Sequence, residues 1–145
     1  MPPSARRQRI FIAEDDRNLL ELLTTRLGLA GYETLFGRDG WEALDGIHSS
    51  RPAAIVLDVN MPRLDGFGVL RHLKKSPTAA KIPVMMLTAR NAPSDIKEAL
   101  ALGARDYLAK PFTDAMLLAR VARLLRPAPV AAAVAAATPS NEVLL

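Results

Sequence analysis

The sequence has 145 residues, of which 50% are hydrophobic and 23% charged, a composition typical of one globular domain with a substantial core. It contains no cysteine, which excludes a disulfide framework and thiolate metal sites, and no apolar run reaches membrane-spanning length. The arginines near the amino terminus are not followed by an apolar stretch, so no secretory signal peptide is predicted and we expect a cytoplasmic protein.

The formal net charge of +4 owes much to Arg6, Arg7 and Arg9 at the amino terminus. Between residues 10 and 126 there are 16 basic and 14 acidic residues, which indicates a mixed surface rather than a concentrated basic patch. We therefore expect neither direct nucleic-acid binding by this domain nor membrane association.

Short apolar segments rich in β-branched residues alternate with segments of helical period. The predicted strands are residues 9–13, 33–36, 53–58, 83–88 and 105–109. The predicted helices are residues 16–31, 38–50, 65–76, 92–104 and 112–126. Because parallel neighbours need a helical crossover, this alternation predicts an α/β fold with a five-stranded parallel sheet covered on both faces.

Individual residues refine this assignment. Ser94 and Thr113 are predicted helix N-caps, and Asp16 is expected to cap a helix or face solvent. Met85 and Met86 lie in an uninterrupted apolar run, so they are predicted core residues rather than metal ligands.

The composition changes after residue 126. Residues 127–145 are rich in alanine, with three prolines and a single charged residue, and have few of the large apolar side chains that offset the entropy of ordering. We therefore predict a disordered head at residues 1–8, a folded domain at residues 9–126, and an Ala/Pro-rich linker or tail at residues 127–145.

Polar residues stand at the carboxyl ends of four predicted strands. Glu14 and Asp15 follow the first strand, Asp58 ends the third, Thr88 ends the fourth, and Lys110 follows the fifth. In an open parallel sheet, ligands bind at these ends near the switch in strand order. Each residue alone could be a helix cap or a solvated charge, but together they predict a site.

The residue types at this edge suit a particular chemistry. Clustered carboxylates prefer a hard divalent cation such as Mg²⁺. A carboxylate beside such a cation can attack a phosphoryl group, whose oxygens a lysine and a hydroxyl can stabilise. The residues therefore predict an aspartyl phosphate.

Four motifs in order, "AEDD", "IVLDVNMPRLDG", "MMLTA" and "DYLAKPF", resemble the receiver domain of bacterial two-component response regulators over residues 10–126. The resemblance implies a flavodoxin-like (βα)5 doubly wound sheet of order 2-1-3-4-5. It also implies a phosphorylation-activated switch rather than an enzyme, with only Mg²⁺-dependent self-phosphorylation and slow autodephosphorylation.

The resemblance also assigns roles at the site. Asp58 would accept a phosphoryl group from a sensor histidine kinase or a phosphotransfer protein. Mg²⁺ or Mn²⁺ would be held by Glu14, Asp15, Asp58 and the main-chain carbonyl of Asn60. Asn60 and Arg90 would tune the lifetime of the phosphoryl group.

The family's switch maps onto further residues. Thr88 and Lys110 would contact the phosphoryl oxygens, and the Lys110 to Pro111 peptide bond is expected to be cis. Thr88 would move toward the phosphoryl group while Tyr107 turns inward. The surface of the last two helices and the last strand would then control an effector protein, or an output domain after residue 127 if the chain is a fragment.

The residues of that surface differ from those in the receivers of winged-helix transcription factors, which typically dimerise through charge pairs on the same surface. Asp106 and Arg120 are compatible with such a pair, but Ile96 and Met116 replace an expected cation and carboxylate, and Arg105 replaces an expected acid. We therefore do not expect that dimer geometry, and we predict an apolar contact at Ile96 and Met116 if this face binds a partner. A phosphorylation-dependent homodimer stays open.

Three other functions fit the sequence less well. A phosphatase with an aspartate nucleophile usually has a second acid two positions on, where this chain has Asn60. A flavodoxin-type flavin binder needs a loop rich in hydroxyls and glycine after the first strand, whereas "EDDRN" would repel a phosphate. A receiver-like scaffold that is never phosphorylated would be expected to lack site residues, and none is missing here.

Overall fold

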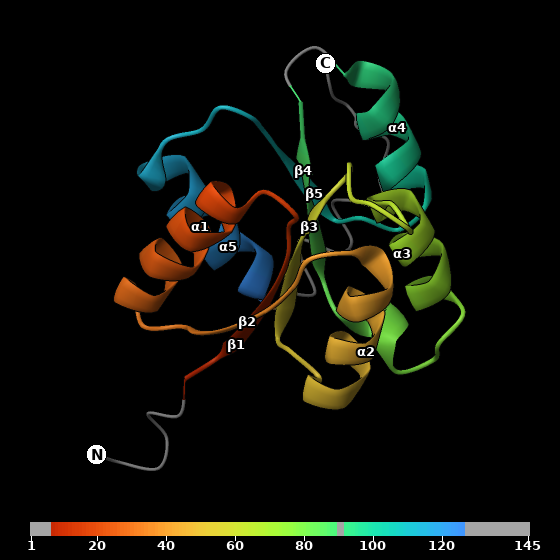
Figure 1. Cartoon of the computed structure of the whole chain (residues 1–145), viewed down its shortest axis with the longest axis horizontal. Coiled ribbons are helices and arrows are strands. Elements are labelled where there is room, and N and C mark those ends of the chain that lie inside the picture. Colours follow the sequence, from red (N-terminus) through yellow and green to blue (C-terminus); the bar gives the residue numbers. More distant parts are fainter. Residues whose placement is uncertain (1–6, 90–91, 127–145) are drawn as a thin grey trace, which may run out of the picture.

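The computed structural model describes residues 7–89 and 92–126 (Figure 1). Within these ranges the strands are β1 (Arg9–Ala13), β2 (Glu33–Gly37), β3 (Ala54–Asp58), β4 (Val84–Thr88) and β5 (Asp106–Ala109). The helices are α1 (Arg17–Leu29), α2 (Gly40–Ser50), α3 (Gly66–Lys74), α4 (Pro93–Ala101) and α5 (Asp114–Leu125), with a short 3-10 turn, η2 (Ala79–Lys81). The predicted tail, most of the predicted head and Arg90 lie outside the described residues.

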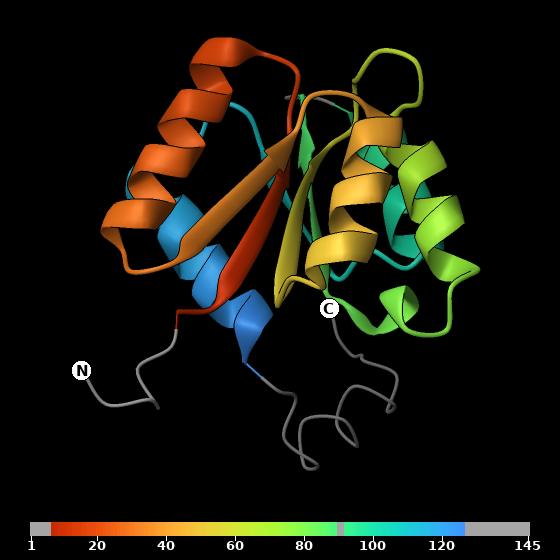
Figure 2. The same ribbon diagram turned by 60° about the horizontal axis from the view of Figure 1, so that its bottom comes forward.

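The strands form one parallel sheet in the order β2-β1-β3-β4-β5, which confirms the predicted fold. Figures 1 and 2 show α1 and α5 on one face of this sheet and α2, α3 and α4 on the other. The register pairs Asp58 with Leu87 and Thr88 with Ala109. The carboxyl ends of the central strands therefore meet at one edge of the sheet.

Each face of the sheet has its own buried cluster. Ile10, Ile12 and Met85 pack with α1 and α5, whereas Phe11 and Met86 pack with α2 and α3. Successive residues of a strand point to opposite faces, so an uninterrupted apolar strand can be buried on both sides. Met85 and Met86 are both fully buried, which confirms their prediction as core residues.

Two predicted helix caps are confirmed. The side chain of Asp16 accepts hydrogen bonds from the main-chain nitrogens of Asn18 and Leu19 at the start of α1. Thr113 accepts one from the nitrogen of Met116 at the start of α5. Both contacts satisfy main-chain donors that have no partner within the first turn of a helix.

The prediction of Ser94 as a cap is wrong. Helix α4 begins at Pro93, and Ala92 occupies the cap position without a side-chain hydrogen bond. Proline suits the first helical position because its fixed φ matches the helix and its missing N–H has no partner there. The proline therefore starts the helix one residue before the serine.

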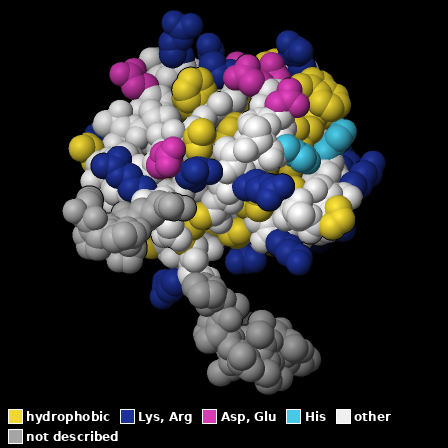
Figure 3. Space-filling view, turned by 90° about the horizontal axis from the view of Figure 1, so that it is seen from below, with side chains coloured by type: hydrophobic (Ala, Val, Ile, Leu, Met, Phe, Trp, Pro, Cys, Tyr) yellow, Lys and Arg dark blue, Asp and Glu magenta, His cyan; other side chains and the backbone are white. Residues whose placement is uncertain are grey.

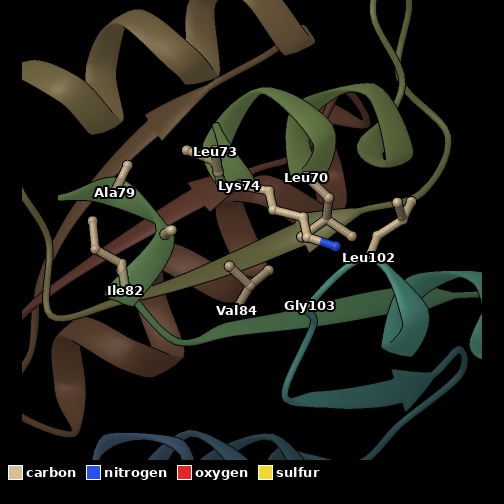
Figure 4. Close-up of a pocket in the computed structure, with 9 residues that line it drawn as sticks. Leu70, Leu73, Lys74, Ala79, Ile82, Val84, Leu102 and Gly103 are labelled. Atoms are coloured by element: carbon tan, nitrogen blue, oxygen red, sulfur yellow. The ribbon is translucent and has the colours of Figure 1, made fainter. Parts of the chain in front are cut away.

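Pockets of different sizes lie at the opposite end of the sheet, where the strands begin. One of about 470 Å³ is lined by Arg9 and Arg51 among others, and one of about 50 Å³ is lined by Leu73, Ile82 and Val84 among others (Figure 4). Ligand pockets are commonly about 300–1,000 Å³. Figure 3 views this end and shows Lys and Arg side chains scattered among acidic and apolar ones.

The helices can also be compared with the thickness of a membrane. Within residues 7–89 and 92–126, no helix is both long and apolar enough to cross a membrane.

Candidate functional site

Two buried carboxylates lie at the carboxyl ends of β1 and β3. Glu14 is 1% exposed and Asp58 is 4% exposed, whereas the neighbouring Asp15 is exposed. The main-chain nitrogen of Glu14 continues the β1–β2 ladder by donating to the carbonyl of Gly37 at 3.1 Å. Its carboxylate is held by a hydrogen bond from the main-chain nitrogen of Asp16 at 3.0 Å. The chain direction after β1 thus buries Glu14 and leaves Asp15 at the surface.

Lys110 connects the two buried carboxylates. Its Nζ lies 3.0 Å from Oδ1 of Asp58 and 3.5 Å from Oε1 of Glu14. Its main-chain nitrogen donates to the carbonyl of Thr88 at 2.7 Å, which fixes the segment after β5 beside the end of β4. The peptide bond between Lys110 and Pro111 is cis, as predicted. The structure thus brings together the predicted acid and lysine residues from three strands.

Glu14 has an unusual protonation equilibrium. The pKa of Glu14 is raised to about 7, mainly by burial and also by the nearby carboxylate of Asp58, while the Asp16 amide and Lys110 act in the opposite direction. Burial dominates because it disfavours the charged form of a carboxyl group. Near neutral pH this carboxyl therefore exchanges readily between its protonated and ionised forms.

Two buried oxygen atoms at the site lack hydrogen-bond partners within the described part of the chain. They are Oγ1 of Thr88 and Oε1 of Glu14. Buried polar atoms without a partner are rare in folded proteins, because each costs its hydration energy. Both atoms therefore retain hydrogen-bonding capacity at this edge of the sheet.

A divalent cation fits these donors. The neighbouring Glu14 and Asp58 carboxylates supply the hard oxygen ligands that Mg²⁺ prefers, and among residues 7–89 and 92–126 Oε1 of Glu14 accepts no hydrogen bond, its contact with Nζ of Lys110 being an ion pair at 3.5 Å. In those same ranges, no group of three or more His, Asp or Glu side chains is arranged to hold a metal by itself. The predicted set also includes the main-chain carbonyl of Asn60, an exposed residue after β3.

The loop that carries Asn60 is tightly packed against the end of β3. The main-chain nitrogen of Gly66 donates to the carbonyl of Val59 at 2.8 Å, which closes the loop. A Cβ atom at Gly66 would overlap the carbonyl oxygen of Asp58 and lie 2.9 Å from Cα of Val59. Glycine at this position therefore lets α3 begin directly beside Asp58.

The predicted switch residues occupy different environments. Thr88 is fully buried, whereas Tyr107 on β5 is 36% exposed. Arg120 of α5 donates a hydrogen bond to the carbonyl of Tyr107. Tyr107 is thus partly accessible to solvent in this structure.

The predicted partner surface contains an internal ion-pair network. Asp106 lies 3.4 Å from Nη1 of Arg120 and 2.6 Å from Nη2 of Arg123. The Asp106–Arg120 pair therefore forms within one chain. Sequence reasoning missed Arg123, although its spacing of three residues from Arg120 places both on one face of α5.

The rest of this surface is apolar and basic. Met116 is 42% exposed, Ile96 is half-buried and Arg105 is exposed. Leu100 on α4, which was not predicted, is 47% exposed. Its position four residues after Ile96 on a helix was the available signal.

Comparison with known proteins identifies the family of this chain. A family model described as the response regulator receiver domain matches residues 10–122. The Response regulator MprA proteins of Mycolicibacterium vanbaalenii and Mycobacterium avium are each 48% identical over 118 residues, or 81% of this chain. Those residues make up 50% and 51% of the two relatives, so the chain spans about half their length.

Solved structures show the same fold. The chemotaxis response regulator CheY4 of Vibrio cholerae has a TM-score of 0.79 at 31% identity, covering 83% of this chain and 100% of that one. The receiver domain of the sensor histidine kinase PA1611 from Pseudomonas aeruginosa, described with a magnesium ion coordinated in its active site cleft, has a TM-score of 0.77 at 30% identity, covering 83% and 98%. Given the family match, the sheet order and these similarities, the chain belongs to the response regulator receiver domain family.

Proposed function

We propose that this domain is a phosphorylation-activated signalling switch in which Asp58 accepts the phosphoryl group. The observation that carries the proposal is the buried Asp58 carboxylate with Lys110 Nζ 3.0 Å away and the unpartnered hydroxyl of Thr88 at the end of the neighbouring strand. An oxygen of Asp58 forms the new bond to phosphorus. The bond between phosphorus and the donor breaks, and its electron pair leaves with the donor.

The surrounding residues act on the charge of the transferred group. When bound, Mg²⁺ or Mn²⁺ would neutralise negative charge on the phosphoryl oxygens. The residues that would hold it are Glu14, Asp15, Asp58 and the carbonyl of Asn60. Lys110 stabilises a second phosphoryl oxygen, and the hydroxyl of Thr88 donates a hydrogen bond to a third. The domain turns over no other substrate in this proposal.

Phosphorylation changes the balance between two packings of the domain. The aspartyl phosphate has nearly two negative charges and three strong acceptor oxygens. Thr88 moves toward it, and Tyr107 turns from its exposed position into the vacated space. Because a population shift requires differential binding, converting a ~1% minor state to a ~99% major state takes roughly 5 kcal/mol. The α4, β5 and α5 surface then contacts an output domain, an effector protein or a second copy of the chain.

This domain has a groove beside Lys110 in which the phosphodonor protein could dock. The groove has a volume of about 620 Å³ and lies between α1 and the segment after β5. Its apolar lining is formed by Leu19, Leu22, Pro111 and Phe112. We propose that a sensor histidine kinase or a phosphotransfer protein docks here in the cytoplasm, which places its phosphorylated side chain near Asp58.

Incubation with acetyl phosphate tests this proposal. With Mg²⁺ present, the wild type is expected to gain one phosphoryl group by intact-protein mass measurement, and chelation of the cation should abolish the gain. Asp58→Asn keeps the shape of the side chain but removes the nucleophile, so it should gain none. An equal gain by wild type and Asp58→Asn, or none by the wild type, would falsify the assignment of Asp58.

A further inference from the structure

Arg38, in the turn between β2 and α2, contacts the loop that carries the proposed cation ligands. Its Nη2 donates a hydrogen bond to the main-chain carbonyl of Asp15 at 3.2 Å. The side chain is half-buried, and its Nε atom is buried without a hydrogen-bond partner among the described residues. The guanidinium therefore packs against the acidic loop instead of extending freely into solvent.

The turn that carries Arg38 is itself well fixed. The carboxylate of Asp39 accepts a hydrogen bond from the nitrogen of Glu42 at 2.9 Å, and the carboxylate of Glu42 accepts one from the nitrogen of Arg38 at 3.0 Å. This reciprocal arrangement is similar to a capping box. Gly40, which follows Asp39, packs so closely on Leu64 that a Cβ atom at Gly40 would lie 2.6 Å from Cβ of Leu64. Arg38 thus reaches the acidic loop from a rigid base.

The two acidic residues of that loop are held differently. Glu14 is buried and receives a hydrogen bond from the nitrogen of Asp16. Asp15 is exposed, and the contact from Arg38 is made to its main chain rather than to its carboxylate. A hydrogen bond to the carbonyl of Asp15 fixes the peptide plane and leaves the carboxylate free to bind a ligand.

We propose that Arg38 is a positioning residue for the divalent cation, which acts by holding the main chain of Asp15. The inference rests on the proposed function, because that function makes Asp15 a cation ligand. The charge of Arg38 has an opposite effect, since a guanidinium near the site repels a cation. If charge alone mattered, removing Arg38 would tighten Mg²⁺ binding, whereas loss of positioning would weaken it.

Arg63 provides a matched control for the charge. It lies in the loop between β3 and α3, with Nη1 3.7 Å from Oδ2 of Asp39, and its side chain is 70% exposed. Arg63→Met removes one positive charge beside the same turn but does not remove a contact to Asp15. Arg38→Met removes the charge and the hydrogen bond while keeping an unbranched apolar stem of similar length.

The test is calorimetric titration of Mg²⁺ into the metal-free wild type and both variants, with thermal unfolding as a check that each variant is folded. Arg38→Met should bind Mg²⁺ about threefold to tenfold more weakly than Arg63→Met, the range expected for one lost hydrogen bond. In the metal-free protein, the amide hydrogen of Asp16 should exchange faster in Arg38→Met than in Arg63→Met.

The outcomes separate this inference from the proposed function. Equal or tighter Mg²⁺ binding by Arg38→Met relative to Arg63→Met overturns the positioning role and leaves the proposed function intact. Failure of the wild type to bind Mg²⁺ overturns the proposed function, and this inference with it.

Discussion

Nζ of Lys110 lies 3.0 Å from Oδ1 of Asp58, although the two residues are 52 positions apart. The contact is made because β4 lies between β3 and β5, and the three strands end at the same edge. The lysine therefore neutralises a carboxylate that the fold has already buried. It also lies where charge would develop during transfer of a phosphoryl group to Asp58.

Lys110→Met is expected to slow phosphorylation by acetyl phosphate about 100-fold, since removing one preorganised charge-stabilising group typically costs 10²–10³ in rate. Mg²⁺ binding should be unchanged or tighter, because the variant removes a cation that competes for the same carboxylates. Stopped-flow phosphorylation rates and calorimetry measure the two effects separately. Lys81→Met, at an exposed position on η2, should match the wild type in both. Equal losses in rate and in Mg²⁺ affinity would instead indicate general damage to the site.

The raised pKa of Glu14 predicts a specific pH dependence of stability in the metal-free protein. Because this pKa is about 7 in the folded chain against an ordinary value of 4.5, the folded state binds the proton more tightly than the unfolded state. Stability from this group is therefore full below about pH 4.5 and is lost as the pH rises through about 7. The test is urea unfolding of the wild type and Glu14→Gln in the presence of a chelator. Between about pH 5.5 and about pH 8, the free energy of unfolding of the wild type should fall relative to that of the variant.

Mg²⁺ should reverse this dependence. A cation that binds the ionised carboxylate competes with the proton, so added Mg²⁺ should stabilise the wild type more at about pH 8 than at about pH 5.5. A stabilisation by Mg²⁺ that is the same at both pH values would contradict the assignment of Glu14 to the cation site.

Two glycines predict opposite effects of the same substitution. A Cβ atom at Gly40 would overlap the carbonyl oxygen of Leu64, whereas one at Gly28, within α1, would meet no atom within 4 Å. Gly40→Ala should therefore lower the free energy of unfolding by about 2 kcal/mol or more through overpacking. Gly28→Ala should raise it by about 0.5–1 kcal/mol, since alanine favours the helix. Urea unfolding of both variants gives the comparison, and a loss of stability in Gly28→Ala would contradict the geometry of α1.

The sequence predicted the positions of residues that depend on strand order and strand ends. Uninterrupted apolar runs such as the one containing Met85 and Met86 identified the central strands, and the rule for parallel sheets placed Asp58 and Lys110 at one edge. These features follow from hydrophobic period and topology. Strand segments could therefore be assigned from the sequence without knowledge of any side-chain contact.

Contacts between side chains on different elements could not be predicted in the same way. Arg38 reaches Asp15 only because β2 lies beside β1, and many arginines in such a turn would point into solvent. Asp106 was predicted as a residue available for pairing with a partner, but the α5 helix places two arginines against it. In both cases the partner depends on the rotation of a helix or the path of a turn, which hydrophobic period does not specify.

The pairing of Asp106 predicts a measurable role in attaching α5 to the sheet. Its side chain is 12% exposed, pairs with Arg120 and Arg123, and accepts a hydrogen bond from the nitrogen of Tyr107 at 2.8 Å. Asp106→Asn should lower the free energy of unfolding by about 1–2 kcal/mol. The control is Glu98→Gln, because the pair between Glu98 and Arg71 is about half exposed and should contribute under about 1 kcal/mol. Equal effects of the two substitutions in urea unfolding would argue against an anchoring role.

The same internal pairing bears on how this domain associates after phosphorylation. Since Asp106 is already neutralised within its own chain, the exposed groups left on this face include the apolar side chains of Leu100 and Met116. We predict that phosphorylated chains self-associate through this apolar surface. Sedimentation velocity with acetyl phosphate and Mg²⁺ should show a dimer that persists in about 0.5 M NaCl, where screening weakens contacts between exposed charges.

The double variant Ile96→Asp, Met116→Asp should remain monomeric under the same conditions, because two carboxylates would be desolvated in the contact. Met116→Asp alone, at a position that is 42% exposed, should change the free energy of unfolding by no more than about 0.5 kcal/mol and still weaken association. Asp58→Asn should abolish association without altering the surface. Dimerisation that disappears at high salt would show that charge pairs form the contact, and a double variant that associates like the wild type would place the interface elsewhere.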